Sequence, residues 1–108
     1  MNGSARSADE PGQHPTPRGA VSRVFVICNK KGLHARASAK FVQTVEKFDA
    51  DVRVMRCGEI VGGTSIMGLM MLAASPGTSI IVEATGKDAA RVIEALTALI
   101  NSRFGEDD

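Results

Sequence analysis

Hydrophobic and polar residues alternate in patterns that predict seven short elements after an unpatterned N-terminal segment. Runs of strand-forming or alternating residues predict four strands, at residues 24–28, 51–56, 60–61 and 78–84. Hydrophobic residues at helical spacing predict three helices, at residues 33–48, 66–72 and 87–103. The expected order is strand, helix, strand, strand, helix, strand, helix.

This order predicts the fold class. The tight turn Cys57-Gly58-Glu59 joins the second and third strands into a hairpin, so their pairing should be antiparallel. Each helix must bury one hydrophobic stripe, and a single sheet can cover all three stripes with one face. We therefore expect an α+β open-faced β-sandwich, in which three helices cover one face of a four-stranded antiparallel sheet. The pattern does not determine the order of the strands.

The chain is expected to hold one domain with a tail at each end. Residues 1–20 are rich in Pro, Gly, Ser and Thr and lack hydrophobic periodicity, which predicts a disordered tail. Residues 21–104 form the predicted domain. Residues 105–108 are predicted to be an acidic, solvent-exposed tail, since they include Glu106, Asp107 and Asp108.

Composition narrows the possible functions. Thirteen basic and twelve acidic residues leave a net charge of +1, which argues against a general polyanion binder. The four Phe are the only aromatic residues, so base-stacking on single-stranded nucleic acid is not expected. Cys28 and Cys57 form no C-x-x-C motif, which favours reduced thiols and a cytoplasmic protein. No hydrophobic run approaches the roughly 20 residues of a membrane helix, and no signal peptide is evident.

The segment Gly32-Leu33-His34-Ala35-Arg36 lies where a predicted strand passes into a predicted helix. If His34 is at the N-cap, its imidazole lies beside free amides, which together with the helix dipole attract anions. Arg36 adds a planar set of donors suited to phosphate. A neutral imidazole is nucleophilic, so His34 could accept a phosphoryl group and later release it. An ordinary surface or capping role for His34 remains the alternative.

The short helix at 66–72 carries two further candidate sites. Ser65 is well suited to cap this helix, because its hydroxyl can accept a bond from a first-turn amide. Leu69 and Leu72 are expected to face the core. Exposed methionines suit adaptable binding surfaces, so a docking patch is predicted on the other side of the helix, at Ile66, Met67 and Met70. Burial of all these residues in the core is the alternative.

No cofactor or metal is expected. His34, Cys28 and Cys57 do not have the spacing of a known metal site. Gly62-Gly63 is not part of a phosphate-binding P-loop motif, and a tight turn explains it better.

Gly32-Leu33-His34-Ala35-Arg36 after a short strand, followed by Thr64-Ser65-Ile66-Met67-Gly68, resembles the HPr phosphocarrier family of the phosphoenolpyruvate-dependent phosphotransferase system. The resemblance spans about residues 21–104. The motifs resemble those of alphaproteobacterial members of the family, which often serve the nitrogen-related branch of the system. The resemblance implies the HPr fold and a phosphoryl carrier that is not itself an enzyme. A monomer is expected, since nothing in the sequence demands a larger assembly. Its expected partners are enzyme I, enzyme IIA domains and HPr kinase/phosphorylase.

The resemblance also implies roles for single residues. His34 would accept phosphate at Nδ1, Arg36 would steady the phosphoryl group, and Ser65 would be the regulatory phosphorylation site. Ile66, Met67 and Met70 would belong to the partner-docking face. One difference is that Ala37-Ser38 stands where the family usually has Pro-Ala. Since Ala favours helix and Pro is only tolerated in the first turn, the helix should still start here.

Two other functions remain open at this stage. One is a regulatory binding module that signals through Ser65 without transferring phosphate. The other is a small RNA-binding domain that uses the basic residues around His34, although the near-neutral charge and scarce aromatic residues argue against it. The sequence does not name the final phosphoryl acceptor, nor does it distinguish sugar transport from nitrogen or carbon regulation.

Overall fold

A computed structural model describes residues 20–72 and 74–106. The strands are β1 (Val21–Val26), β2 (Asp51–Arg56), β3 (Glu59–Gly62) and β4 (Ser79–Thr85). The helices are α1 (Ala35–Val45), α2 (Ile66–Met71) and α3 (Ala89–Asn101), followed by the 3-10 turn η1 (Arg103–Gly105). The predicted order of elements is confirmed. The expected N-terminal tail lies outside the described residues, apart from residue 20.

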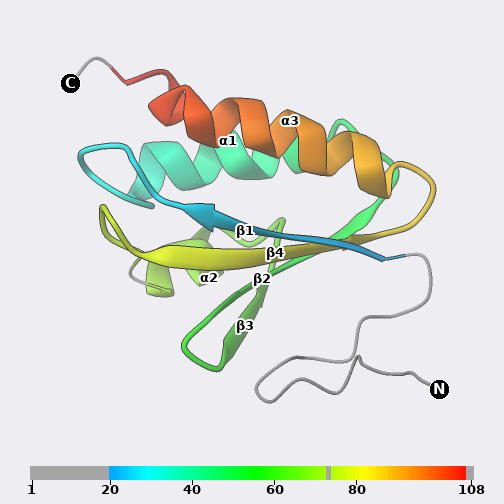
Figure 1. Cartoon of the computed structure of the whole chain (residues 1–108), viewed down its shortest axis with the longest axis horizontal. Coiled ribbons are helices and arrows are strands. Elements are labelled where there is room, and N and C mark those ends of the chain that lie inside the picture. Colours follow the sequence, from blue (N-terminus) through cyan, green and yellow to red (C-terminus); the bar gives the residue numbers. More distant parts are fainter. Residues whose placement is uncertain (1–19, 73, 107–108) are drawn as a thin grey trace, which may run out of the picture.

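All four strands form one antiparallel sheet in the order β1-β4-β2-β3. Figure 1 shows α1 and α3 side by side along one face of this sheet. The open-faced sandwich expected from the element order is therefore confirmed. The strand order, which the sequence pattern left open, places β4 between β1 and β2 at the centre of the fold.

The helix-covered face of the sheet contains alternate residues of each strand. On β4 these residues are Ile80, Val82 and Ala84, and all three are fully buried. The hydrophobic stripes of the two long helices pack onto them, through Ala37, Phe41 and Val45 of α1 and Val92, Leu96 and Ile100 of α3. Burial of each larger side chain stabilises the fold by about 1.5–3 kcal/mol.

The three helices are shorter than predicted, and the first strand lies earlier in the chain. Strand β1 ends at Val26, so Cys28 lies outside the sheet and is exposed, with Sγ 3.3 Å from the carbonyl oxygen of Ile100. Helix α1 begins at Ala35 because the residues before it form a loop with its own hydrogen bonds. Helix α3 ends at Asn101, since Arg103 and Phe104 adopt positive φ angles of 57° and 56° that a right-handed helix does not allow.

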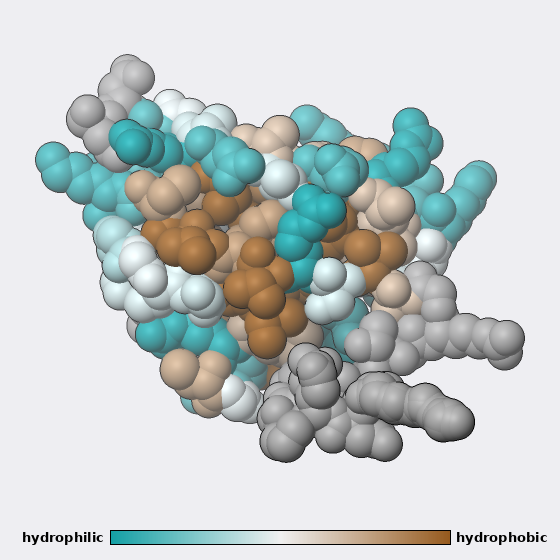
Figure 2. All heavy atoms as spheres, viewed as in Figure 1, coloured by the Kyte–Doolittle hydropathy of each residue, from teal (hydrophilic) through white to brown (hydrophobic). Residues whose placement is uncertain are grey.

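The opposite face of the sheet is more polar at its centre. Arg53 and Glu83 are cross-strand partners and form an ion pair, although Glu83 is only 3% exposed. Hydrophobic side chains are exposed on the edge strand β1, where Val24 and Val26 are 62% and 55% exposed. Figure 2 shows hydrophobic surface across the middle of the molecule, surrounded by hydrophilic residues.

The loop between β1 and α1 is held against the segment that follows α2. The amide of Leu33 donates a hydrogen bond to the carbonyl of Ala74, at 3.0 Å. Gly32 has φ +67°, and a Cβ placed on it would lie 2.3 Å from the same carbonyl oxygen. Only glycine satisfies both the left-handed backbone and this close approach. Gly32 therefore fixes the position of the residues that enter α1.

Substitution Gly32→Ala should destabilise the protein more than Gly58→Ala. Both glycines have positive φ, but a Cβ at Gly58 would meet nothing within 4 Å. Gly58→Ala should therefore cost only the left-handed backbone penalty of about 1–2 kcal/mol. Gly32→Ala should cost about 1–3 kcal/mol more, because the backbone of Ala74 must move. Urea denaturation of the three proteins measures the difference, and equal losses would contradict this account of the loop.

Candidate functional site

His34 lies at the N-cap of α1, as the sequence predicted. Its backbone is extended, with φ −77° and ψ −177°, and its side chain makes no capping hydrogen bond. The first helical hydrogen bond runs from the amide of Ser38 to the carbonyl of His34, at 2.8 Å. The amides of residues 35–37 thus precede the hydrogen-bonded ladder, and no N-cap side chain satisfies them. Such a helix start attracts an anion.

Basic side chains surround this helix start. His34 lines a hollow of about 710 Å³ together with Lys30, Lys31, Ala35, Arg36, Lys40, Gly105 and Glu106. Arg36 is exposed and forms no hydrogen bond or ion pair with residues 20–72 or 74–106. Lys40 is engaged, because its Nζ donates to the carbonyl of Phe104 at 2.6 Å. The guanidinium of Arg36 is therefore available to a ligand.

The imidazole of His34 is partly exposed and uses only one of its nitrogens. The side chain is 28% exposed. Nε2 contacts Oε2 of Glu106. Nδ1 has no hydrogen-bond partner within the described part of the chain. The nitrogen that the family resemblance assigns to phosphorylation is thus the unoccupied one.

Glu106 is a site residue that the sequence analysis missed. It was expected in a solvent-exposed tail, but its side chain is only 13% exposed. Nδ2 of the buried Asn29 lies 3.2 Å from each of its carboxylate oxygens. The hydrogen bond to His34 lowers the pKa of Glu106, with smaller contributions from Asn29 and the charge of Lys31, while burial acts in the opposite direction. The prediction of an exposed tail is wrong at this residue; Asp107 and Asp108 lie outside the described residues.

Ser65 is the N-cap of α2, as predicted. Its hydroxyl accepts a hydrogen bond from the amide of Gly68 at 2.9 Å. A Cβ on Gly68 would lie 2.8 Å from that hydroxyl oxygen, so a glycine leaves room for the cap. Ser65 is exposed and hence accessible to a modifying enzyme.

Helix α2 presents two distinct sides. Leu69 and Leu72 are buried, as expected. The three predicted docking residues are exposed, Ile66 at 39%, Met67 at 71% and Met70 at 43%. We call these three residues the methionine patch. Met71 is also 71% exposed, although the sequence analysis did not assign it to a surface. The backbone hydrogen bond between Leu33 and Ala74 joins the segment that follows α2 to the residue before His34.

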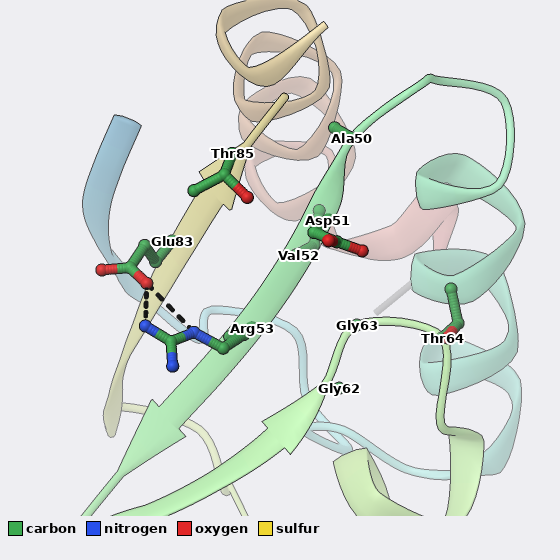
Figure 3. A pocket seen from close by; sticks show the side chains of 9 residues that line it. All are labelled: Ala50, Asp51, Val52, Arg53, Gly62, Gly63, Thr64, Glu83 and Thr85. Atoms are coloured by element: carbon green, nitrogen blue, oxygen red, sulfur yellow. Dashed lines mark hydrogen bonds and ion pairs between the residues drawn. The ribbon is translucent and has the colours of Figure 1, made fainter. Parts of the chain in front are cut away.

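A second hollow, of about 600 Å³, lies at the other face of the sheet between β2, β3 and β4. Figure 3 shows the Arg53 guanidinium and the Glu83 carboxylate directed toward each other there, so these charges satisfy each other. Across residues 20–72 and 74–106, no group of three or more His, Cys, Asp or Glu is arranged to hold a metal ion. No helix in the same residues has the length and hydrophobicity needed to cross a membrane.

The lowered pKa of Glu106 predicts how its contribution to stability depends on pH. Its stabilising effect is complete above the ordinary carboxyl pKa and is lost as the pH falls through the lowered value of the folded state. Wild type should therefore exceed Glu106→Gln by about 1 kcal/mol or less in unfolding free energy at neutral pH. Urea denaturation at a series of pH values should show this difference shrinking in acid. A difference that stays constant through the acid range would contradict the assignment.

Comparison with known proteins gives a consistent result. A family model described as "PTS HPr component phosphorylation site" matches residues 21–102. Phosphocarrier protein HPr of Neisseria meningitidis serogroup A is 55% identical over 82 residues, which cover 76% of this chain and 92% of that protein. Phosphocarrier protein NPr of Shewanella violacea is 35% identical over 86 residues, which cover 80% of this chain and 94% of that protein.

A solved structure agrees with these sequence matches. The crystal structure of HPr-C-His from Thermoanaerobacter tengcongensis has a TM-score of 0.78 and 42% sequence identity, and it covers 82% of this chain and 99% of its own. The fold, the family model and the relatives all match the predicted resemblance. The chain therefore belongs to the HPr family of the phosphotransferase system, whose members are phosphocarrier proteins, intermediates in phosphoryl transfer rather than enzymes.

Proposed function

We propose that this protein carries a phosphoryl group on Nδ1 of His34 in the cytoplasm. Enzyme I would supply the group, derived from phosphoenolpyruvate, and a histidine of an enzyme IIA domain would receive it. The observation that carries this proposal is the position of His34 at an uncapped helix start, with Nδ1 unoccupied and Arg36 beside it. Family membership supports the same role.

The proposed reaction is a direct transfer between nitrogen atoms. The lone pair of Nδ1 attacks phosphorus, and the new N–P bond forms as the bond to the donor nitrogen of enzyme I breaks. The first-turn amides of α1 and the guanidinium of Arg36 stabilise the negative charge on the phosphoryl oxygens. Release is the same reaction in the other direction. A histidine of the next partner attacks the phosphorus atom, and the bond between phosphorus and Nδ1 of His34 breaks.

The methionine patch is the proposed docking face. Its side chains are exposed and apolar, and the segment after α2 is hydrogen-bonded to the loop that carries His34. A hydrophobic centre with charged groups around it suits an interface that several partners use in turn. The partners we infer are enzyme I and enzyme IIA domains. We infer a monomer, since the docking face must remain free for them.

Ser65 is the proposed regulatory site, phosphorylated by HPr kinase/phosphorylase. A phosphate there would add a charge of about −1.5 to −2 at pH 7. Its oxygens would remain near the amide of Gly68, which the hydroxyl already binds, so the helix should stay folded. The new charge would adjoin Ile66 and weaken the docking of acidic partners.

Labelling tests the carrier function. Incubation with enzyme I and labelled phosphoenolpyruvate should give wild type an acid-labile, base-stable phosphate. His34→Ala should take up no label, because the nucleophile is missing. His14→Ala is the matched control, since the chain has two histidines, and it should be labelled like wild type. Undiminished label on His34→Ala would refute the proposal. A wild type that takes no label, but still changes partner binding through Ser65, would indicate a regulatory module instead.

Substitution Ser65→Asp tests the regulatory site. Aspartate is a good N-cap, so the fold should be retained. The added charge should weaken binding to enzyme I about tenfold, which corresponds to about 1.4 kcal/mol. Ala90→Asp, at an exposed residue in the first turn of α3, adds the same charge away from α2; it is the control and should bind like wild type. Titration calorimetry measures both affinities. Equal binding by wild type and Ser65→Asp would show that charge at Ser65 does not control docking.

A further inference from the structure

The chain after α3 is built to bring Glu106 back to His34. Arg103, Phe104 and Gly105 have consecutive positive φ values of 57°, 56° and 72°, which reverse the direction of the backbone. The left-handed region is unfavourable for residues that carry a Cβ, so the surrounding structure must stabilise this turn. Phe104 is only 1% exposed and belongs to the core cluster. Its carbonyl accepts the hydrogen bond from Lys40, and this bond ties the turn to α1.

The carboxylate that arrives there is held from two sides. Asn29, which is fully buried, donates from Nδ2 to Glu106 and also to the carbonyl of Gly32, at 2.8 Å. Oε2 of Glu106 also contacts Nε2 of His34. Asn29, Glu106 and His34 thus form a chain of hydrogen bonds that starts in the buried loop and ends on the imidazole. This arrangement restrains the ring through Nε2 and leaves Nδ1 without a hydrogen-bond partner among the described residues.

A carboxylate on one imidazole nitrogen selects the tautomer. An ionised carboxylate only accepts hydrogen bonds, so its partner nitrogen must carry the proton. With the proton on Nε2, the lone pair lies on Nδ1. We propose that Glu106 is a positioning residue for phosphoryl transfer, because it binds the Nε2 proton of His34 and thereby presents Nδ1 unprotonated to the incoming phosphorus. This inference rests on the proposed carrier function of His34.

The same contact suits the phosphorylated ring. When the Nδ1 lone pair forms the N–P bond, the ring keeps its Nε2 proton and becomes an imidazolium, so no proton leaves during attack. The carboxylate of Glu106 then accepts a hydrogen bond from a positively charged ring, which is stronger than a bond from a neutral one. Lys30, Lys31, Arg36 and Lys40 line the same hollow and offset the repulsion between this carboxylate and the phosphoryl oxygens.

The test uses the full-length chain labelled with ¹⁵N in its histidines. Nitrogen NMR of the neutral imidazole at alkaline pH should show Nδ1 unprotonated and Nε2 protonated in wild type. Glu106→Ala should give a mixture of tautomers. Glu59→Gln alters an exposed glutamate of β3 and should match wild type. Circular dichroism confirms that each variant is folded. With enzyme I, phosphorylation of Glu106→Ala should be slower by about tenfold or more.

The two measurements separate this inference from the carrier function. Identical tautomers in wild type and Glu106→Ala, or a protonated Nδ1 in wild type, would overturn the positioning role. A shifted tautomer with an unchanged phosphorylation rate would also overturn it, while the carrier function would stand. Faster phosphorylation of Glu106→Ala would show that the carboxylate competes with phosphate for the basic hollow. If wild type shows the predicted tautomer but is never phosphorylated, the carrier function fails instead.

Discussion

The hydrogen bond between Leu33 and Ala74 decides where α1 begins, and the rest of the site depends on that start. Because Gly32 approaches the carbonyl of Ala74 closely, the loop cannot shift without breaking its contact with the segment after α2. The buried stripe of Ala37, Phe41 and Val45 then sets the rotation of the helix on the sheet. Together these constraints place His34 at the N-terminus of α1, in the hollow that Lys30, Lys31 and Arg36 also line. Core packing therefore positions a reactive side chain that is itself partly exposed.

A carrier must bind each partner and also release it. The methionine patch offers a small apolar surface that can adapt to different partners, and such surfaces do not require one rigid complement. The hollow around His34 is open and basic rather than enclosed. Both features favour contacts of limited lifetime. On the proposed regulation, the charge added at Ser65 would lie beside the proposed docking surface, so regulation and transfer would use one region of the molecule without competing for the same atom.

Local patterns predicted the elements, the fold class, the position of His34 and the cap at Ser65, because each depends on residues close in sequence. The strand order could not be predicted in this way, since it depends on pairing between distant segments. Glu106 was missed for a similar reason. Its role requires two non-glycine residues, Arg103 and Phe104, to adopt left-handed backbone angles, and no propensity predicts that. Gly105 is a local sign of the turn, because glycine adopts positive φ readily, but a glycine near the end of a helix does not indicate where the following residues go.

The N-cap positions of α1 and α2 are occupied in two different ways. Ser65 caps α2 through its own hydroxyl, so the side chain and an amide satisfy each other. His34 occupies the same position on α1 but does not cap it, because its ring turns to Glu106. The first-turn amides of α1 are thereby left for a ligand. A serine at position 34 would satisfy an amide and remove the proposed nucleophile, whereas a histidine held by a distant carboxylate would supply that nucleophile and leave the first-turn amides for an anion.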